Sequence, residues 1–96
     1  MEYTDEIIAK MQSLGALGYG VEKIINILDV PEQDSAMFRS DFANPDSSIR
    51  RAYQKGVDKS DYIIDKKLYE LAQTGDLKAI ETYENKKMVN RQNQED

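Results

Sequence analysis

Apolar positions recur with a helical period over most of the second half of the chain. They follow one another in steps of three and four, which places them in a stripe about 120° wide on a helix. The stripe consists of Ile49, Tyr53, Val57, Ile64, Leu68 and Leu71. Asn44-Pro45 suits the start of this helix, because Asn caps free N–H groups and Pro fits the first helical position. Gly75 suits the left-handed residue at its end.

A second helix is expected to follow this stop and to fold back on the first, with Asp76 as its cap. Its facing stripe consists of Leu77, Ile80, Tyr83 and Met88. The pattern therefore predicts a helical hairpin over Asn44–Lys87.

Three shorter helices are predicted before the hairpin. The first covers residues 7–14 behind the cap Thr4, and three closely spaced glycines are expected to end it. The second covers Val21–Leu28, and the third covers Glu32–Phe42 after a break at Pro31. We therefore predict an all-α fold with a helix-turn-helix-like unit at 1–43, a hairpin at 44–88 and a polar, disordered tail at 89–96.

The second and third short helices, joined by a turn, are the ingredients of a helix-turn-helix, with the first helix as support. A plain three-helix cluster that binds no DNA is equally open at this point, because short helices joined by glycine or proline turns are common in small α-domains.

Composition excludes several classes of site. The 96 residues contain no cysteine and no histidine, which removes disulfides, thiolate nucleophiles, imidazole bases and most zinc sites. No nucleophile–base pair and no phosphate-cradling glycine loop is present. We therefore expect no enzymatic activity, no catalytic residue, no cofactor and no metal. No apolar run approaches the length of a membrane span, so no membrane contact is expected.

Charge is distributed unevenly along the chain. The net charge is −5, which argues against a generic nucleic-acid-binding surface. Residues 1–46 carry nine acidic and three basic residues, whereas residues 47–96 carry nine acidic and ten basic residues. The basic residues therefore gather in the hairpin.

Two groups of residues are candidates for contact with DNA. Arg and Gln side chains can read base edges, and the third short helix offers Gln33, Ser35, Arg39 and Ser40, although acidic neighbours there oppose phosphates. The start of the long helix offers the best basic group, namely Arg50, Arg51 and Lys55. An ordinary solvated helix face is the alternative interpretation of this basic group.

Aromatic residues on the long helix suggest a contact beyond the hairpin. Tyr62 and Tyr69 are seven residues apart and lie roughly opposite the apolar stripe, so the hairpin is not expected to bury them. A neighbouring subunit or the N-terminal helices are the two candidate partners. Association would also help so small a core. The candidates for self-association are Tyr53, Tyr62, Ile64, Leu68, Tyr69, Leu71, Ile80 and Tyr83.

The order of these features resembles phage DNA-packaging proteins of the terminase small-subunit type and related prophage helix-turn-helix proteins. The resemblance is sharpest over residues 52–80, in Ala52-Tyr53-x-x-Gly56 and in Leu71-Ala72-x-x-Gly75-Asp76-x-x-Ala79-Ile80. In these motifs Gly56 is expected to permit the close approach of a neighbouring helix, and Gly75 to form a turn.

The resemblance implies a non-enzymatic subunit that recognises double-stranded viral DNA, forms a homo-oligomer through its hairpin and presents the DNA to a separate large terminase subunit. It implies a cytoplasmic location in a bacterium or an infected cell. Two alternatives remain open: a protein–protein adaptor with a degenerate helix-turn-helix, and a small DNA-binding regulator. The acidic character of Glu32–Phe42 favours the adaptor.

Overall fold

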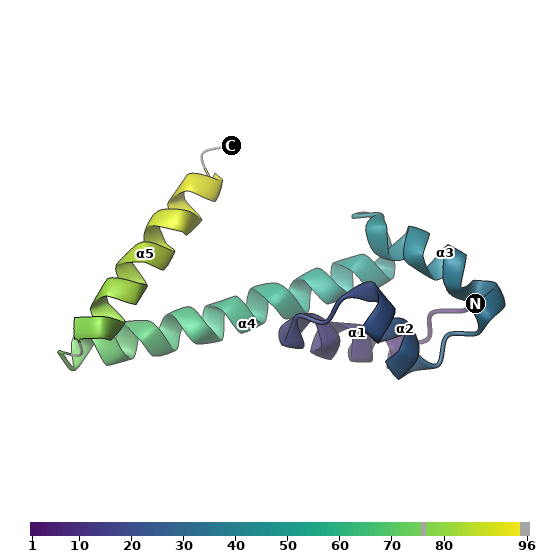
Figure 1. The fold of residues 1–96 in the computed structure, drawn as a ribbon, viewed down its shortest axis with the longest axis horizontal. Coiled ribbons are helices and arrows are strands. Elements are labelled where there is room, and N and C mark those ends of the chain that lie inside the picture. Colours follow the sequence, from purple (N-terminus) through teal and green to yellow (C-terminus); the bar gives the residue numbers. More distant parts are fainter. Residues whose placement is uncertain (76, 95–96) are drawn as a thin grey trace. The chain divides into compact units, whose positions relative to one another are not determined.

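The computed structural model describes residues 1–75 and 77–94, and helices are the only regular secondary structure in this part of the chain (Figure 1). The predicted all-α fold is therefore confirmed. The helices are α1 (Asp5–Leu17), α2 (Val21–Leu28), α3 (Glu32–Ala43), α4 (Ser48–Gln73) and α5 (Leu77–Gln94). The chain divides into two units, Met1–Ser60 and the residues from Asp61 onward. We call them unit 1 and unit 2.

Helix α1 begins as its sequence predicts and ends later. The Thr4 hydroxyl accepts a hydrogen bond from the Ile7 N–H at 3.3 Å, and Asp5 and Glu6 occupy the first turn, where the helix dipole favours carboxylates. The prediction that the glycine cluster ends the helix is confirmed, because Gly18 forms the C-cap, but the expected end near Leu14 is wrong. The helix continues through Gly15, which is buried, and ends at Gly18, whose φ is 73°.

Helices α2 and α3 have the predicted bounds to within one residue and form a helix-turn-helix arrangement. Asp29 ends α2 in the left-handed conformation with φ 53°, and the Val30 N–H donates back to the Ile25 carbonyl at 3.1 Å. Aspartate tolerates this conformation better than most residues do. The turn also buries Val30, which ties it to the core.

Helix α4 begins at Ser48, so the expectation that Asn44-Pro45 opens it is wrong. The Asn44 side chain instead accepts the Asp46 N–H at 3.0 Å within a turn. The Ser47 hydroxyl accepts the Arg50 N–H at 3.1 Å, which is the bond expected of an N-cap. The turn residues therefore separate α3 from α4, and Ser47 starts the helix.

Two glycines let α1 and α4 touch backbone to backbone within unit 1. A Cβ added to Gly56 would stand 2.9 Å from the backbone nitrogen of Ala16 and closer still to the backbone oxygen of Gln12. A Cβ on Gly15 would likewise overlap the backbone of Tyr53. The expected close approach at Gly56 is confirmed. Because α1 packs on the first turns of α4, unit 1 extends to Ser60 rather than ending at residue 43.

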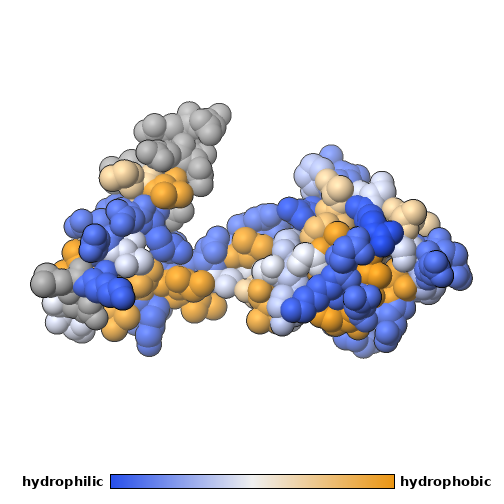
Figure 2. Space-filling model, in the orientation of Figure 1, coloured by the Kyte–Doolittle hydropathy of each residue, from blue (hydrophilic) through white to orange (hydrophobic). Residues whose placement is uncertain are grey.

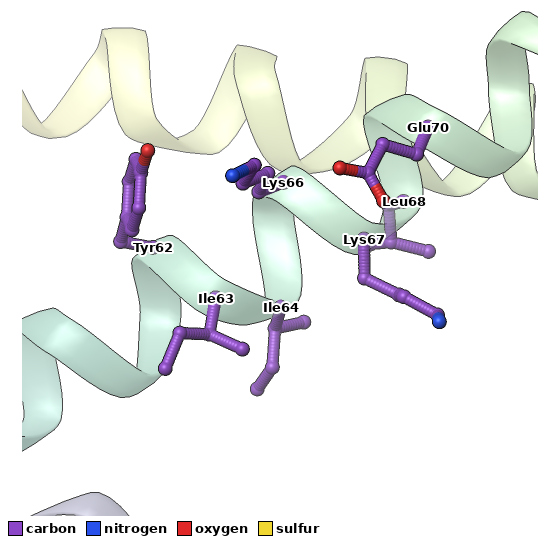
Figure 3. Close-up of a pocket in the computed structure, with 7 residues that line it drawn as sticks. All are labelled: Tyr62, Ile63, Ile64, Lys66, Lys67, Leu68 and Glu70. Carbon is purple, nitrogen blue, oxygen red and sulfur yellow. The ribbon is translucent and has the colours of Figure 1, made fainter.

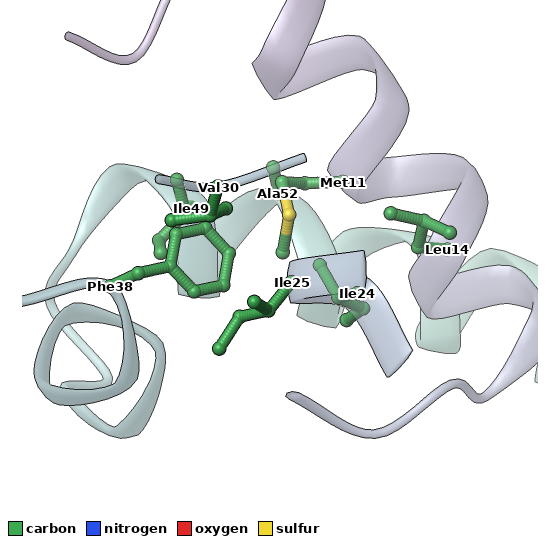
Figure 4. Packing of buried hydrophobic residues seen from close by; sticks show 8 residues of the cluster. All are labelled: Met11, Leu14, Ile24, Ile25, Val30, Phe38, Ile49 and Ala52. Atoms are coloured by element: carbon green, nitrogen blue, oxygen red, sulfur yellow. The ribbon is translucent and has the colours of Figure 1, made fainter. Parts of the chain in front are cut away.

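The core of unit 1 draws on all four of its helices and on the turn before α3 (Figure 4). Its buried apolar residues are Met11, Leu14, Ile24, Ile25, Val30, Phe38, Ile49 and Ala52. The Phe38 ring lies beside Val30 and Ile49 in this cluster (Figure 4). Tyr53 also belongs to unit 1, where its hydroxyl donates to the Tyr19 carbonyl at 2.8 Å and its ring meets Phe42 edge-on at 4.9 Å.

Unit 2 contains the second half of α4 and α5, joined at Gly75, whose φ of 89° is left-handed as predicted. Asp76 and the side chains of Leu77 and Ala79 lie outside the described residues. Helix α5 continues to Gln94, past the expected end near Met88, because the intervening sequence contains no glycine or proline to stop it. Residues 95–96 of the predicted tail lie outside the description.

The contacts between α4 and α5 differ from those expected. Lys86 pairs with Asp65 at 3.0 Å, and the Tyr69 and Tyr83 rings lie 5.5 Å apart. Ile64 and Leu71 of the predicted facing stripe stay exposed, as does Met88. Helix α5 thus contacts the side of α4 that carries Asp65 and Tyr69, but Tyr69 stays exposed, so the expectation that the hairpin does not bury it is confirmed.

Candidate functional site

The surface of α3 offers less to DNA than its sequence suggests. Gln33 and Ser40 are exposed. Ser35 is buried, and its hydroxyl donates to the Pro31 carbonyl at 3.2 Å. A serine held in this way within the helix is not placed to contact a base or a phosphate. Of the four candidates on α3, only Gln33 and Ser40 therefore present an uncommitted polar group.

Arg39, the single cation of α3, is held by α2. Its guanidinium donates to both carboxylate oxygens of Glu22, at 2.7 and 3.0 Å. This bidentate geometry is the favourable one for an Arg–carboxylate pair. The hydrogen bonds to Arg39 lower the pKa of Glu22, and the same bonds raise the pKa of Arg39. A DNA phosphate that approached Arg39 would have to displace Glu22.

The segment before α1 covers another part of α3. The Tyr3 hydroxyl donates to the Asp41 carboxylate, and its ring meets Phe38 edge-on at 6.3 Å. The amino group of Met1 lies 3.9 Å from the Asp34 carboxylate. Burial, followed by the hydrogen bond to Asp41, raises the pKa of the Tyr3 hydroxyl. Tyr3 was not among the predicted site residues, because it precedes the periodic pattern of α1 and carries no helical signal.

The basic candidates of α4 line one shallow groove, which we call the α4 basic groove. Its volume is about 490 Å³. The lining residues are Pro45, Arg50, Arg51, Gln54, Lys55, Asp58 and Lys59. Arg50 lies over the rings of Phe42 and Tyr53, at 4.8 and 5.1 Å from their centroids. The structure thus places Arg50, Arg51, Lys55 and Lys59 around one groove.

A second groove, of about 530 Å³, lies on α4 within unit 2. We call it the α4 apolar surface. It is lined by Tyr62, Ile63, Ile64, Lys66, Lys67, Leu68 and Glu70. Tyr62 and Ile63 are 66% and 65% exposed. Figure 3 shows Ile63 and Ile64 extending in the same direction from the helix, and Figure 2 shows apolar residues at the surface of this unit. Ile63 was missed because it falls outside the predicted stripe.

The remaining candidates for self-association have different surroundings. Tyr53 is engaged inside unit 1, where it is not free to contact a second chain. Tyr69 and Tyr83 contact each other, and Gln73 donates to the Tyr69 hydroxyl at 2.8 Å. Leu71 is exposed and Ile80 half-buried. The most exposed candidate is therefore Tyr62, followed by Ile64 and Tyr69, and Ile63 is about as exposed as Tyr62.

None of the helices in the described part of the chain has both the length and the apolar character that a membrane span requires. Among the same residues, the acidic side chains form no cluster of three placed to hold a metal ion.

Comparison of the chain with protein-family models, with curated proteins and with solved structures found no match.

Proposed function

We propose that this protein is a non-enzymatic DNA-recognition subunit of phage or prophage genome packaging, of the terminase small-subunit type. One observation carries the proposal: a helix-turn-helix unit continues, through the single helix α4, into a hairpin with an exposed apolar surface. The resemblance of residues 52–80 to packaging subunits agrees with this order of parts. The large terminase subunit is the partner that the resemblance implies.

Self-association through the α4 apolar surface is part of the proposal. Burial of a side chain such as Ile or Leu contributes roughly 1.5–3 kcal/mol relative to its exposure. Tyr62, Ile63 and Ile64 lie within one turn of α4. A second copy that covered Ile63 and Ile64, which extend in the same direction from the helix (Figure 3), would therefore contribute two such increments at each contact. Lys66, Lys67 and Glu70 border this surface, which gives it the polar rim found around protein interfaces.

Light scattering over a range of protein concentrations tests the assembly. We expect a closed complex of several subunits for the natural chain and a smaller species for the Tyr62→Ser/Ile63→Ser variant. Leu17→Ser/Met37→Ser is the matched control, because these two apolar residues of unit 1 are also exposed but lie outside the proposed contact. A monomer at every concentration would contradict the proposal.

A protein–protein adaptor is the second candidate, and the state of α3 favours it. Arg39 is bound to Glu22, Ser35 is buried, and Glu32 adds negative charge at the start of the helix. Such a surface suits a protein partner better than a polyanion. The two functions are separated by labelled duplex DNA at low salt: an assembled protein that binds no duplex is an adaptor, whereas salt-sensitive binding supports packaging.

A further inference from the structure

The proposed function leaves open which surface of unit 1 meets the DNA, and the structure contains one electropositive surface suited to it. In a helix-turn-helix, the second helix is the expected reader of the major groove. Here that helix is α3, whose one cation is bound to Glu22 and whose first turn carries Glu32 and Asp34. A surface of this sign repels phosphates.

The α4 basic groove has the opposite character. It is lined by Arg50, Arg51, Lys55 and Lys59 and by a single acidic residue, Asp58. The Asp58 carboxylate accepts a hydrogen bond from the Gln54 amide at 3.1 Å. None of the four cations takes part in an ion pair within the described residues. The groove therefore presents four cations to an incoming anion.

The spacing of the cations suits an extended polyanion better than a single small anion. Arg51, Lys55 and Lys59 follow one another at intervals of four residues, so they lie on successive turns, about 6 Å apart along the helix. The row is therefore about 12 Å long. Duplex DNA carries one phosphate per about 3.4 Å of axis on each strand. Because each strand winds around the axis, its phosphates are spaced more widely along the strand than this rise, so a strand aligned with the row would bring about two phosphates within reach of its three cations.

Arg50 adds a cation whose position is set by its surroundings. Its guanidinium lies over the rings of Phe42 and Tyr53, and both rings pack against the core of unit 1. A guanidinium stacked in this way loses less side-chain freedom when it binds a phosphate than a free lysine does.

We propose that the α4 basic groove, rather than the exposed face of α3, holds the phosphate backbone of duplex DNA. This inference rests on the proposed function, since it assigns the DNA-binding surface of the same subunit. Phosphate contacts carry no sequence information by themselves. The groove therefore binds unrelated duplexes with similar affinity, and sequence preference, where it exists, arises from elsewhere in the assembly.

Binding of the full chain to a short labelled duplex, measured by fluorescence anisotropy over a range of salt concentrations, tests the assignment. The groove variant is Arg51→Gln/Lys55→Gln. Each phosphate contact contributes about 0.9 to the slope of log K against log salt, so the double substitution lowers the slope by about 1.8 for each protomer in contact with DNA. The affinity at low salt should fall by at least tenfold.

Lys10→Gln/Lys23→Gln is the matched control. It removes the same amount of charge from exposed residues of unit 1 that lie outside the groove. The slope of log K against log salt should therefore be the same for this variant as for the natural chain. Equal losses of DNA affinity in the two variants would show that binding depends on overall charge and not on the groove. This result would overturn the assignment. Circular dichroism of each variant verifies that unit 1 is folded.

Three further outcomes separate the assignment from the proposed function. Loss of binding in Arg39→Gln, with the groove variant unaffected, would place the DNA on α3 and overturn the assignment while the packaging function stands. Tighter binding of single-stranded RNA than of duplex DNA would overturn the choice of partner. Failure of the natural chain to bind any duplex at low salt would contradict the proposed function itself.

Discussion

Unit 1 and unit 2 are both built from helices, but they differ in whether their apolar side chains are buried. All eight buried apolar core residues belong to unit 1. In unit 2, no described residue is buried, and Tyr62, Ile63 and Met88 are more than half exposed. Unit 1 therefore has a buried apolar core, whereas unit 2 leaves its large apolar side chains at the surface.

The difference follows from what each helix meets. In unit 1 the glycines at positions 15 and 56 let α4 come close to α1, and α2 and α3 close the remaining sides of the core. In unit 2 the second half of α4 has a single partner helix, α5, within the chain. One partner covers one side of a helix, so apolar residues on the other sides stay exposed.

The largest expected effect tests whether the stability of the chain comes from unit 1. Phe38→Ala removes a fully buried ring, and such substitutions cost about 3–5 kcal/mol. Urea unfolding followed by circular dichroism measures the loss, in the Tyr62→Ser/Ile63→Ser background so that association does not contribute. Met37→Ala, at an exposed position of the same helix, should change the unfolding free energy little. Equal losses of unfolding free energy in the two variants would contradict the conclusion that the core of unit 1 stabilises the chain.

The second prediction concerns the contact between α1 and α4. Gly56→Ala places a methyl group against the α1 backbone, and overpacking of this kind costs about 1–3 kcal/mol. Alanine's higher helix propensity offsets at most about 1 kcal/mol of this. Gln54→Ala, on the exposed side of the same helix, is the control in thermal unfolding. A variant as stable as the natural chain would show that the two backbones are not in contact.

A smaller effect is expected within unit 2. A double-mutant cycle on Tyr69 and Tyr83, with each replaced by Ala, measures the coupling of the two rings. Contacts between aromatic rings contribute about 0.5–1.5 kcal/mol, and the exposure of Tyr69 places this pair near the lower end. Thermal unfolding in the same monomeric background supplies the four free energies. A coupling as large as the Phe38 effect would show that unit 2 has a core of its own.

The smallest effect is the pH dependence of the Glu22–Arg39 pair. The pKa of Glu22 is lowered in the folded state, so its contribution to stability is present above the ordinary value of 4.5 and is lost as the pH falls through the lowered pKa. Glu22→Gln should therefore flatten the acid limb of the melting temperature slightly. Added salt should shrink the difference, because both groups are exposed. Glu32→Gln, outside this pair, is the control.

Local chemistry made much of the fold predictable. Features that depend on neighbours a few residues away have their expected roles. Thr4 caps α1, Gly75 is left-handed, and the apolar period of Val21–Leu28 forms α2. The errors arose where local rules compete with packing. Gly15 looks like a helix breaker, but burial against Tyr53 stabilises the helix there. Asn44-Pro45 looks like a helix start, but the turn places Ser47 at the cap.

The sequence by itself determined the all-helical class, the order of the helices and the gathering of basic residues at the start of α4. These properties depend on periodicity, on turn chemistry and on charge, each of which is determined by residues close together in the sequence. Only the tertiary structure decided which polar groups are available. Arg39 is engaged by Glu22 from 17 positions away, and Tyr53 by Tyr19 from 34. Contacts over such separations follow from how helices pack, and no local pattern encodes them.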